Sequence, residues 1–196
     1  MANILLIDNI DSFTYNLVDQ LRKLKHKVLI YRNTISYKFI LKCLNKIKNP
    51  ILILSPGPGK PKNSGCMPKL IFNIKGKIPI IGICLGYQAI IESYGGKIIN
   101  SKKIMHGYSS LIKHDNKNMF YNIKNPIQVA RYHSLIGVNI KNKLVVNSKY
   151  KNIVMSVRNN KDKICGFQFH PESILTTYGS SILESSILWS LKFYKN

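Results

Sequence analysis

Near its middle the sequence reads Pro79-Ile-Ile-Gly-Ile-Cys-Leu-Gly-Tyr-Gln88, an apolar run that passes through a cysteine into a helix. The helix is predicted from Leu85 to Gly95, and the run before it is typical of a strand buried on both faces. Gly82 and Gly86 remove side chains where the strand and the helix approach each other, so we expect Cys84 to hold a strained backbone conformation. This stretch predicts a nucleophile elbow in which a thiol replaces the usual hydroxyl.

Similar apolar runs and helical stretches alternate before this elbow. Strands are expected at Asn3–Asp8, Lys27–Tyr31, Pro50–Ser55 and Ile78–Ile83, with helices at Phe13–Lys25 and Ile35–Ile47. After Lys97 the pattern changes to shorter strands at Val145–Asn147, Val154–Val157 and Cys165–Phe169, and a last helix at Ser180–Phe193. We therefore expect an α/β fold: an open, mostly parallel sheet flanked by helices, with an antiparallel extension. One domain should span residues 1–196, with its site at the loops that follow the parallel strands.

Length and composition limit the class of protein. The chain has 196 residues, of which 45% are hydrophobic and 19% charged, so it can bury a substantial core. No apolar stretch approaches the roughly 20 residues needed to cross a bilayer. The N-terminal residues lack the features of a secretory signal. We expect a cytoplasmic protein without membrane association.

The strongest bias in the composition is its positive charge. Thirty Lys and Arg against eight Asp and Glu give a formal net charge of +22. A polyanion-binding protein is one interpretation. However, only four of these residues are arginine, and the lysines are spread along a chain rich in Ile and Asn, as codon drift in an AT-biased genome would produce. We favour drift and expect no specific nucleic-acid partner.

Cysteine and histidine spacing gives no sign of a metal or disulfide framework. The four cysteines show no C-x-x-C pair, and the five histidines lack the spacing of a zinc-binding helix. We expect no metal site.

A thiolate nucleophile needs a proton acceptor, and that acceptor needs a group to orient it. The stretch Gly166-Phe-Gln-Phe-His-Pro-Glu172 supplies both at the end of a strand. His170 is the candidate acid and base, and Glu172 is the candidate orienting carboxylate. Together with Cys84 they predict a Cys-His-Glu triad.

Acyl transfer also requires backbone N–H donors for the oxyanion. The segment Leu54-Ser-Pro-Gly-Pro-Gly-Lys-Pro61 is a rigid loop after the third strand. We expect the N–H of Gly57 to act as one donor, together with the N–H of Leu85, the residue after the nucleophile. Without Cys84, the same loop would read as an ordinary Pro/Gly turn.

These motifs resemble those of the triad-type (class I) glutamine amidotransferases over essentially the whole chain. The pattern of the small subunits of anthranilate synthase is similar at Asp8–Leu17, Lys103–Gly107, Ala130–Leu135 and Phe167–Leu175. The glutaminase subunits of aminodeoxychorismate synthase share most of it. Within that pattern, Tyr87 stands where His is frequent in the family and Tyr108 where Lys is common.

The resemblance implies that Cys84 attacks the side-chain amide of glutamine. It also implies that His170, oriented by Glu172, protonates the departing ammonia and then activates water against the glutamyl thioester. Residues implied to bind glutamine are Gly57, Pro58, Gly59, Gln88, Ser134 and Leu135. It implies no cofactor in this subunit, with Mg²⁺ on a synthase partner. Ammonia would pass to that partner, the anthranilate synthase large subunit, which converts chorismate to anthranilate and pyruvate for tryptophan biosynthesis.

The resemblance also implies a partner interface. It would include Asp11, Ser12, Tyr15, Lys103, His106 and Gly107. Three alternatives remain open at this point: service to aminodeoxychorismate synthase or to both synthases, a cysteine hydrolase that acts without a partner, and a non-enzymatic nucleic-acid binder.

Overall fold

The computed structural model describes residues 1–101 and 105–195, and a long twisted sheet organises them. In spatial order this nine-stranded sheet of the described residues contains β2 (Lys27–Arg32), β1 (Asn3–Asp8), β3 (Pro50–Leu54), β4 (Ile80–Ile83), β11 (Ile164–Phe167), β10 (Ile153–Asn159), β9 (Val145–Tyr150), β6 (Tyr108–His114) and β7 (Ile127–Arg131). Neighbours from β2 to β11 are parallel. From β11 to β7 they are antiparallel.

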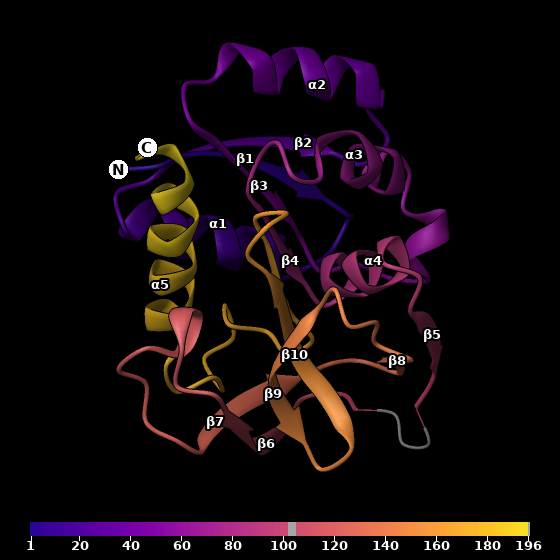
Figure 1. The fold of residues 1–196 in the computed structure, drawn as a ribbon, viewed down its shortest axis with the longest axis vertical. Coiled ribbons are helices and arrows are strands. Elements are labelled where there is room, and N and C mark those ends of the chain that lie inside the picture. The colour runs from indigo at the N-terminus through magenta and orange to yellow at the C-terminus, as the bar shows by residue number, and fades with distance from the viewer. Residues whose placement is uncertain (102–104, 196) are drawn as a thin grey trace.

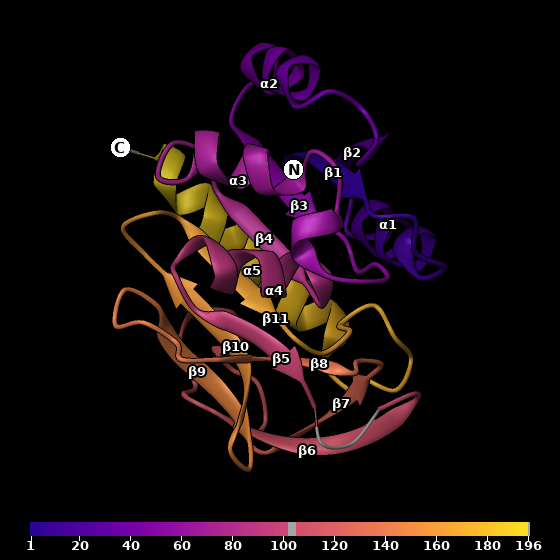
Figure 2. The same ribbon diagram turned by 90° about the vertical axis from the view of Figure 1, so that its right-hand side faces the viewer.

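Helices cover both faces of the parallel half. On one face lie α1 (Thr14–Lys23) and α5 (Gly179–Leu191), and on the other α2 (Tyr37–Lys46), α3 (Met67–Ile74) and α4 (Leu85–Ser93). Figures 1 and 2 show the antiparallel strands β6, β7 and β9 gathered at the end of the molecule opposite α2. Short turns of 3-10 helix are η1 (Pro61–Asn63), η2 (Asn118–Phe120) and η3 (Lys192–Tyr194). No helix among the described residues has the length and apolarity of a membrane span.

The alternation of side chains along β1 explains the two covered faces. Ile4 and Leu6 point into the core shared with α1 and α5, whereas Leu5 and Ile7 point into the core shared with α2, α3 and α4. All four are at most 1% exposed. A strand with both faces buried has no polar side, which is why these strands read as continuous apolar runs.

The expected parallel sheet, its flanking helices and an antiparallel extension are confirmed, and three features were not predicted in detail. The extension includes β6 and β7, and a separate antiparallel pair is formed by β5 (Lys97–Asn100) and β8 (Leu135–Val138). The helix α3 was also missed. It begins beside Pro68 after a Pro/Gly-rich loop and is only eight residues long, so loop signals dominate its sequence.

Two leucines on α5 provide a test of the core. Leu183 is completely buried, whereas Leu188 on the same helix is 55% exposed. Leu183→Ala should lower the free energy of unfolding by about 2 to 5 kcal/mol, because it leaves a cavity. Leu188→Ala has the same helix propensity change and should cost about 0.5 kcal/mol or less. Urea unfolding of both variants measures the difference, and equal losses would contradict this packing.

Candidate active site

Cys84 occupies the turn between β4 and α4 with φ 50° and ψ −97°, a conformation that residues other than glycine rarely adopt. Its glycine neighbours explain how the turn closes. A Cβ added at Gly82 would lie 2.6 Å from the carbonyl carbon and oxygen of Gly86. A Cβ at Gly86 would lie 2.5 Å from the carbonyl oxygen of Leu54 on β3. The predicted role of both glycines, to let strand and helix approach, is therefore observed.

The strained turn is held by neighbouring strands. The N–H of Cys84 donates to the carbonyl oxygen of Phe167 at 2.8 Å, which ties Cys84 to the end of β11. The chain after Phe167 leads within three residues to His170. Because β4 and β11 are parallel neighbours, their carboxyl ends bring the thiol and the imidazole to the same edge of the sheet.

His170 and Glu172 form a buried pair. Nδ1 of His170 lies 2.7 Å from Oε1 of Glu172, and the two residues are 2% and 3% exposed. Burial opposes the charged imidazolium, but the negative charges of Glu172 and Cys84 and the hydrogen bond to Glu172 outweigh it, so the pKa of His170 is well above its ordinary value. The carboxylate also fixes the ring orientation.

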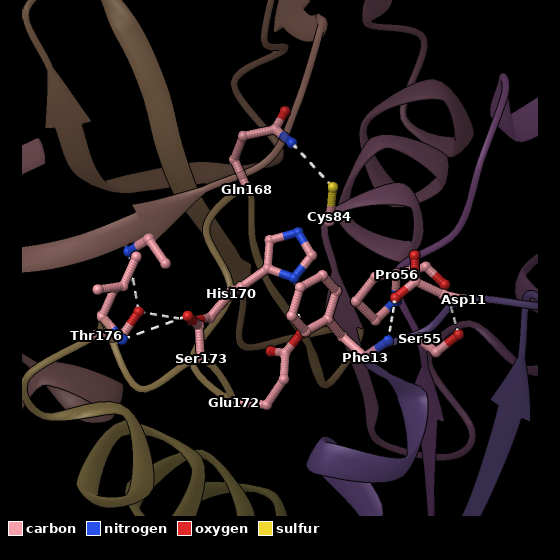
Figure 3. A network of polar contacts seen from close by, with 12 residues as sticks. Asp11, Phe13, Ser55, Pro56, Cys84, Gln168, His170, Glu172, Ser173 and Thr176 are labelled. Atoms are coloured by element: carbon pink, nitrogen blue, oxygen red, sulfur yellow. Dashed lines mark hydrogen bonds and ion pairs between the residues drawn. The ribbon is translucent and has the colours of Figure 1, made fainter. Parts of the chain in front are cut away.

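The second ring nitrogen of His170, Nε2, is the one not bonded to Glu172. Within the described part of the chain, this buried Nε2 has no hydrogen-bond partner. Figure 3 shows the ring between Glu172 and Cys84, with Phe13 beside it. The rings of Phe13 and Tyr132 lie 5.6 and 5.1 Å from the imidazole, both edge-on. A buried nitrogen beside a thiol, shielded by aromatic rings, is suited to proton transfer.

The backbone of His170 is fixed by residues that the sequence analysis did not identify. Its N–H donates to the carbonyl oxygen of Ala130 at 3.1 Å, and its carbonyl oxygen accepts from Oγ1 of Thr176 at 2.6 Å. The same hydroxyl accepts from the N–H of Ala130 at 3.0 Å. A Cβ at Gly179 would collide with the carbonyl of Pro171, so glycine is required where α5 begins. Only the neighbouring His-Pro-Glu motif marked this loop in the sequence.

The expected oxyanion loop lies against the start of α4. A Cβ at Gly57 would lie 2.5 Å from Cβ of Asn9 and 2.8 Å from Cδ2 of Leu85. The backbone N–H of Asn9 donates to Oγ of Ser55 at 2.8 Å, and Nδ2 of Asn9 donates to the carbonyl oxygen of Ser55 at 2.9 Å. Asn9, another residue missed by sequence analysis, therefore clamps this loop. The N–H of Leu85 has no intrahelical acceptor, because it begins α4.

The residues expected to bind glutamine differ in burial, and Gly57 and Leu135 are half-buried. Gln88 is 3% exposed, and its Nε2 donates to the carbonyl oxygen of Leu135 at 3.3 Å. Pro58, Gly59 and Ser134 are exposed. Gln88 and Leu135 are thus brought together, whereas direct contact of all these residues with glutamine stays a prediction.

The two segments expected at a partner interface both contact Tyr132, whose ring lies beside His170. Phe13, between Ser12 and Tyr15, packs 4.9 Å from the ring of Tyr132, and the ring of His106 lies 5.9 Å from Tyr132. The exposed members of the set are Ser12, Tyr15, His106 and Gly107, while Asp11 is half-buried. Lys103 lies outside the described residues.

The described residues contain no group of three or more His, Cys, Asp or Glu side chains placed to hold a metal ion. The site does contain a thiol at a helix N-terminus, an imidazole held by a buried carboxylate, and adjacent backbone N–H groups. These are the components of acyl transfer by a cysteine nucleophile.

Comparisons with known proteins give a consistent family. The sequence model of the family described as glutamine amidotransferase class-I matches residues 5–189. A protein of Buchnera aphidicola subsp. Acyrthosiphon pisum, named anthranilate synthase component 2, is 60% identical over 197 residues, covering 100% of this chain and 98% of the relative. A Vibrio parahaemolyticus protein of the same name is 51% identical, and the match covers 98% of this chain and 98% of that protein. A Helicobacter pylori protein of the same name is 44% identical, and the match covers 94% of this chain and 95% of that protein.

A solved structure shares the fold. The crystal structure of a Thermoplasma acidophilum protein, described as a GMP synthase subunit, superposes with a TM-score of 0.87. It is 24% identical, and the superposition covers 100% of this chain and 96% of that protein. At this identity the likeness shows the fold alone.

The pair of His170 and Glu172 can be tested by removing one charge. Glu172→Gln keeps the shape of the side chain, and the pKa of His170 should fall by about 1 to 3 pH units, because the imidazolium loses its counter-charge. NMR titration of the His170 ring measures this change. Glu184→Gln, the same substitution at an exposed position on α5, is the control. An unchanged titration in the Glu172 variant would mean that the carboxylate does not support the imidazolium.

Proposed function

Because the chain belongs to the glutamine amidotransferase class-I family, we propose that it is the glutaminase subunit of an anthranilate synthase, with a Cys84-His170-Glu172 triad. The observation that carries the proposal is the buried His170–Glu172 pair beside the strained turn of Cys84. Relatives covered almost completely by this chain bear the name anthranilate synthase component 2, which supports the synthase partner.

The reaction begins with the thiolate of Cys84, formed when its proton passes to His170. The sulfur attacks the side-chain amide carbon of glutamine, and the N–H groups of Gly57 and Leu85 stabilise the oxyanion. His170 gives its proton to the departing nitrogen, so that ammonia leaves and a glutamyl thioester remains.

Hydrolysis of the thioester uses the same groups. Neutral His170 removes a proton from water, and the resulting oxygen nucleophile attacks the thioester carbon. Glutamate then leaves, and Cys84 returns to its starting form. Glu172 keeps the imidazole oriented in both halves of the cycle and stabilises its charged form. A Cβ at residue 57 would overlap Asn9 and Leu85, so the loop that carries the Gly57 N–H requires glycine at this position.

The ammonia is used by a partner, the anthranilate synthase large subunit, which converts chorismate to anthranilate and pyruvate. Mg²⁺ and chorismate belong to that subunit, and this chain needs no cofactor for glutamine hydrolysis. Delivery between proteins requires that the partner sit close to the glutaminase site, because free ammonia is protonated in water.

Exposed apolar side chains beside the triad support such a contact. Ile10, Tyr15 and Ile174 are 56%, 67% and 97% exposed. The segments that carry them are joined, since Nε2 of Gln20 on α1 donates to the carbonyl oxygen of Glu172 at 3.2 Å. Isolated apolar side chains are common on surfaces, but a group around an active site indicates an interaction face.

The reaction can be tested with chorismate, Mg²⁺ and an anthranilate synthase large subunit. Cys84→Ser should reduce glutamine-dependent anthranilate formation by about a thousandfold or more while ammonia-dependent formation continues, since only the nucleophile is lost. Cys43→Ser, a half-buried thiol on α2, is the matched control and should retain both activities. Equal loss of both activities would contradict the proposal. Glutamate release without anthranilate would assign the chain to another synthase, such as aminodeoxychorismate synthase.

The interaction face can be tested separately. Ile174→Glu should weaken binding of the large subunit by about tenfold or more, because it places a charge at an apolar contact. Phe72→Glu is the matched control: Phe72 is 83% exposed on α3 and lies apart from the triad loops. Isothermal titration calorimetry gives both affinities. Equal affinities for the two variants would exclude Ile174 from the interface.

A further inference from the structure

Gln168 is a buried amide that contacts the nucleophile. It follows β11 directly, is 0% exposed, and its backbone N–H donates to the carbonyl oxygen of Met155 at 2.8 Å. Its side-chain Nε2 lies 3.7 Å from Sγ of Cys84, a hydrogen-bond distance for sulfur (Figure 3). Neither the triad nor the oxyanion donors account for this contact.

The orientation of this amide is decided by the groups behind it. An amide can present either its N–H₂ or its oxygen to the sulfur, and the hydrogen-bond network determines which. Oε1 of Gln168 lies 3.3 Å from Nε2 of Gln88, and the same Nε2 lies 3.3 Å from the carbonyl oxygen of Leu135. A carbonyl oxygen only accepts, so Gln88 must turn its N–H₂ toward both groups.

It follows that Gln168 must present its oxygen to Gln88 and its N–H₂ to Cys84. Turning the Gln168 amide over would place two donors opposite each other at Gln88. A chain of hydrogen bonds thus runs from the Leu135 carbonyl oxygen through the Gln88 amide to the Gln168 amide. This chain directs an N–H donor of Gln168 toward the sulfur of Cys84. Both side-chain amides are removed from bulk water, since Gln88 and Gln168 are 3% and 0% exposed.

The carbonyl of Leu135 is itself held in place. It accepts from Nδ1 of His133 at 3.0 Å, and Nε2 of His133 accepts from Nε of Arg131 at 3.1 Å. Burial and the charge of Arg131 lower the pKa of His133 to about 4, so this ring is neutral near pH 7 and donates from Nδ1. Arg131 is also buried and donates to Oγ of Ser110 at 3.3 Å.

We propose that Gln168 is a further catalytic residue, which donates an N–H to the thiolate of Cys84 and holds the sulfur for attack. This inference rests on the proposed function, in which Cys84 is the nucleophile. A donor to sulfur favours the thiolate over the thiol, since hydrogen bonds to the charged form stabilise it. His170 supplies the proton partner on the other side of the sulfur, with Glu172 behind it.

Two substitutions that keep the approximate size of the Gln168 side chain distinguish loss of its N–H donor from loss of its packing. Gln168→Met removes the donor and keeps the volume, whereas Gln168→Glu replaces it with an acceptor that repels a thiolate. The pH midpoint for alkylation of Cys84 by iodoacetamide should rise by about one unit in the Met variant and further in the Glu variant. At a pH below these midpoints, one unit corresponds to about tenfold slower alkylation.

Gln128→Glu is the matched control for the change of charge. Gln128 lies on β7, and its side chain is exposed. This variant should keep the alkylation midpoint and the glutaminase activity. Circular dichroism and thermal unfolding establish whether each variant retains its fold, and alkylation of Cys84→Ala gives the background from the other cysteines.

A second measurement uses the unmodified chain. In protein labelled with ¹⁵N-glutamine, the Gln168 side-chain amide should shift with the same pH midpoint as alkylation, and this shift should disappear in Cys84→Ala. Wild-type midpoints retained in both Gln168 variants, or an amide that does not respond to the thiolate, would overturn the inference. If alkylation of wild-type Cys84 left glutaminase activity intact, the proposed function itself would fail.

Discussion

The close approach of α4 to β3 and β4 is the constraint on which the site depends. Side chains at Gly82 and Gly86 would overlap the backbone of the neighbouring element, so the helix begins directly over the strand ends. Closing that turn forces Cys84 to a positive φ, and the surrounding contacts keep it there. The same proximity places the first N–H of α4 beside the Gly57 loop. The packing of helix on strand, the position of the sulfur and the approach of the Gly57 loop to α4 thus follow from one steric condition.

Cys84 follows a strand of the parallel half of the sheet, and residues of the antiparallel strands hold the groups around it in place. His170 follows the last parallel strand, but its backbone is hydrogen-bonded to Ala130 on β7, which is an edge strand of the sheet. The carbonyl of Leu135, which orients Gln88, begins β8 in the separate pair of strands. A site assembled from both halves explains why an otherwise ordinary open α/β sheet in this amidotransferase carries such a long antiparallel extension.

The sequence predicted the elements that have strong local signals. Continuous apolar runs identified the parallel strands, and the glycines around Cys84 identified the elbow, because both patterns arise from local sterics. Thr176, Asn9 and Gln168 were missed. Each is a polar residue whose role is a hydrogen bond to a residue 6 to 84 positions away. Only the fold determines such partners, and nothing in the spacing of the sequence indicates them.

Three of the eight acids hold neighbouring groups in place through hydrogen bonds, which lysine side chains cannot accept. Oδ1 of Asp8, which is buried, accepts from the N–H of Ile10 and from Oγ1 of Thr14 at the turn into α1. Asp162 accepts from the hydroxyl of Tyr94 at 2.6 Å, and Glu172 holds His170. With eight acids among 196 residues the surface is rich in cations, but solvation weakens the interaction of exposed lysines with these carboxylates. The net charge of +22 therefore coexists with a site whose electrostatics are set by short, buried contacts.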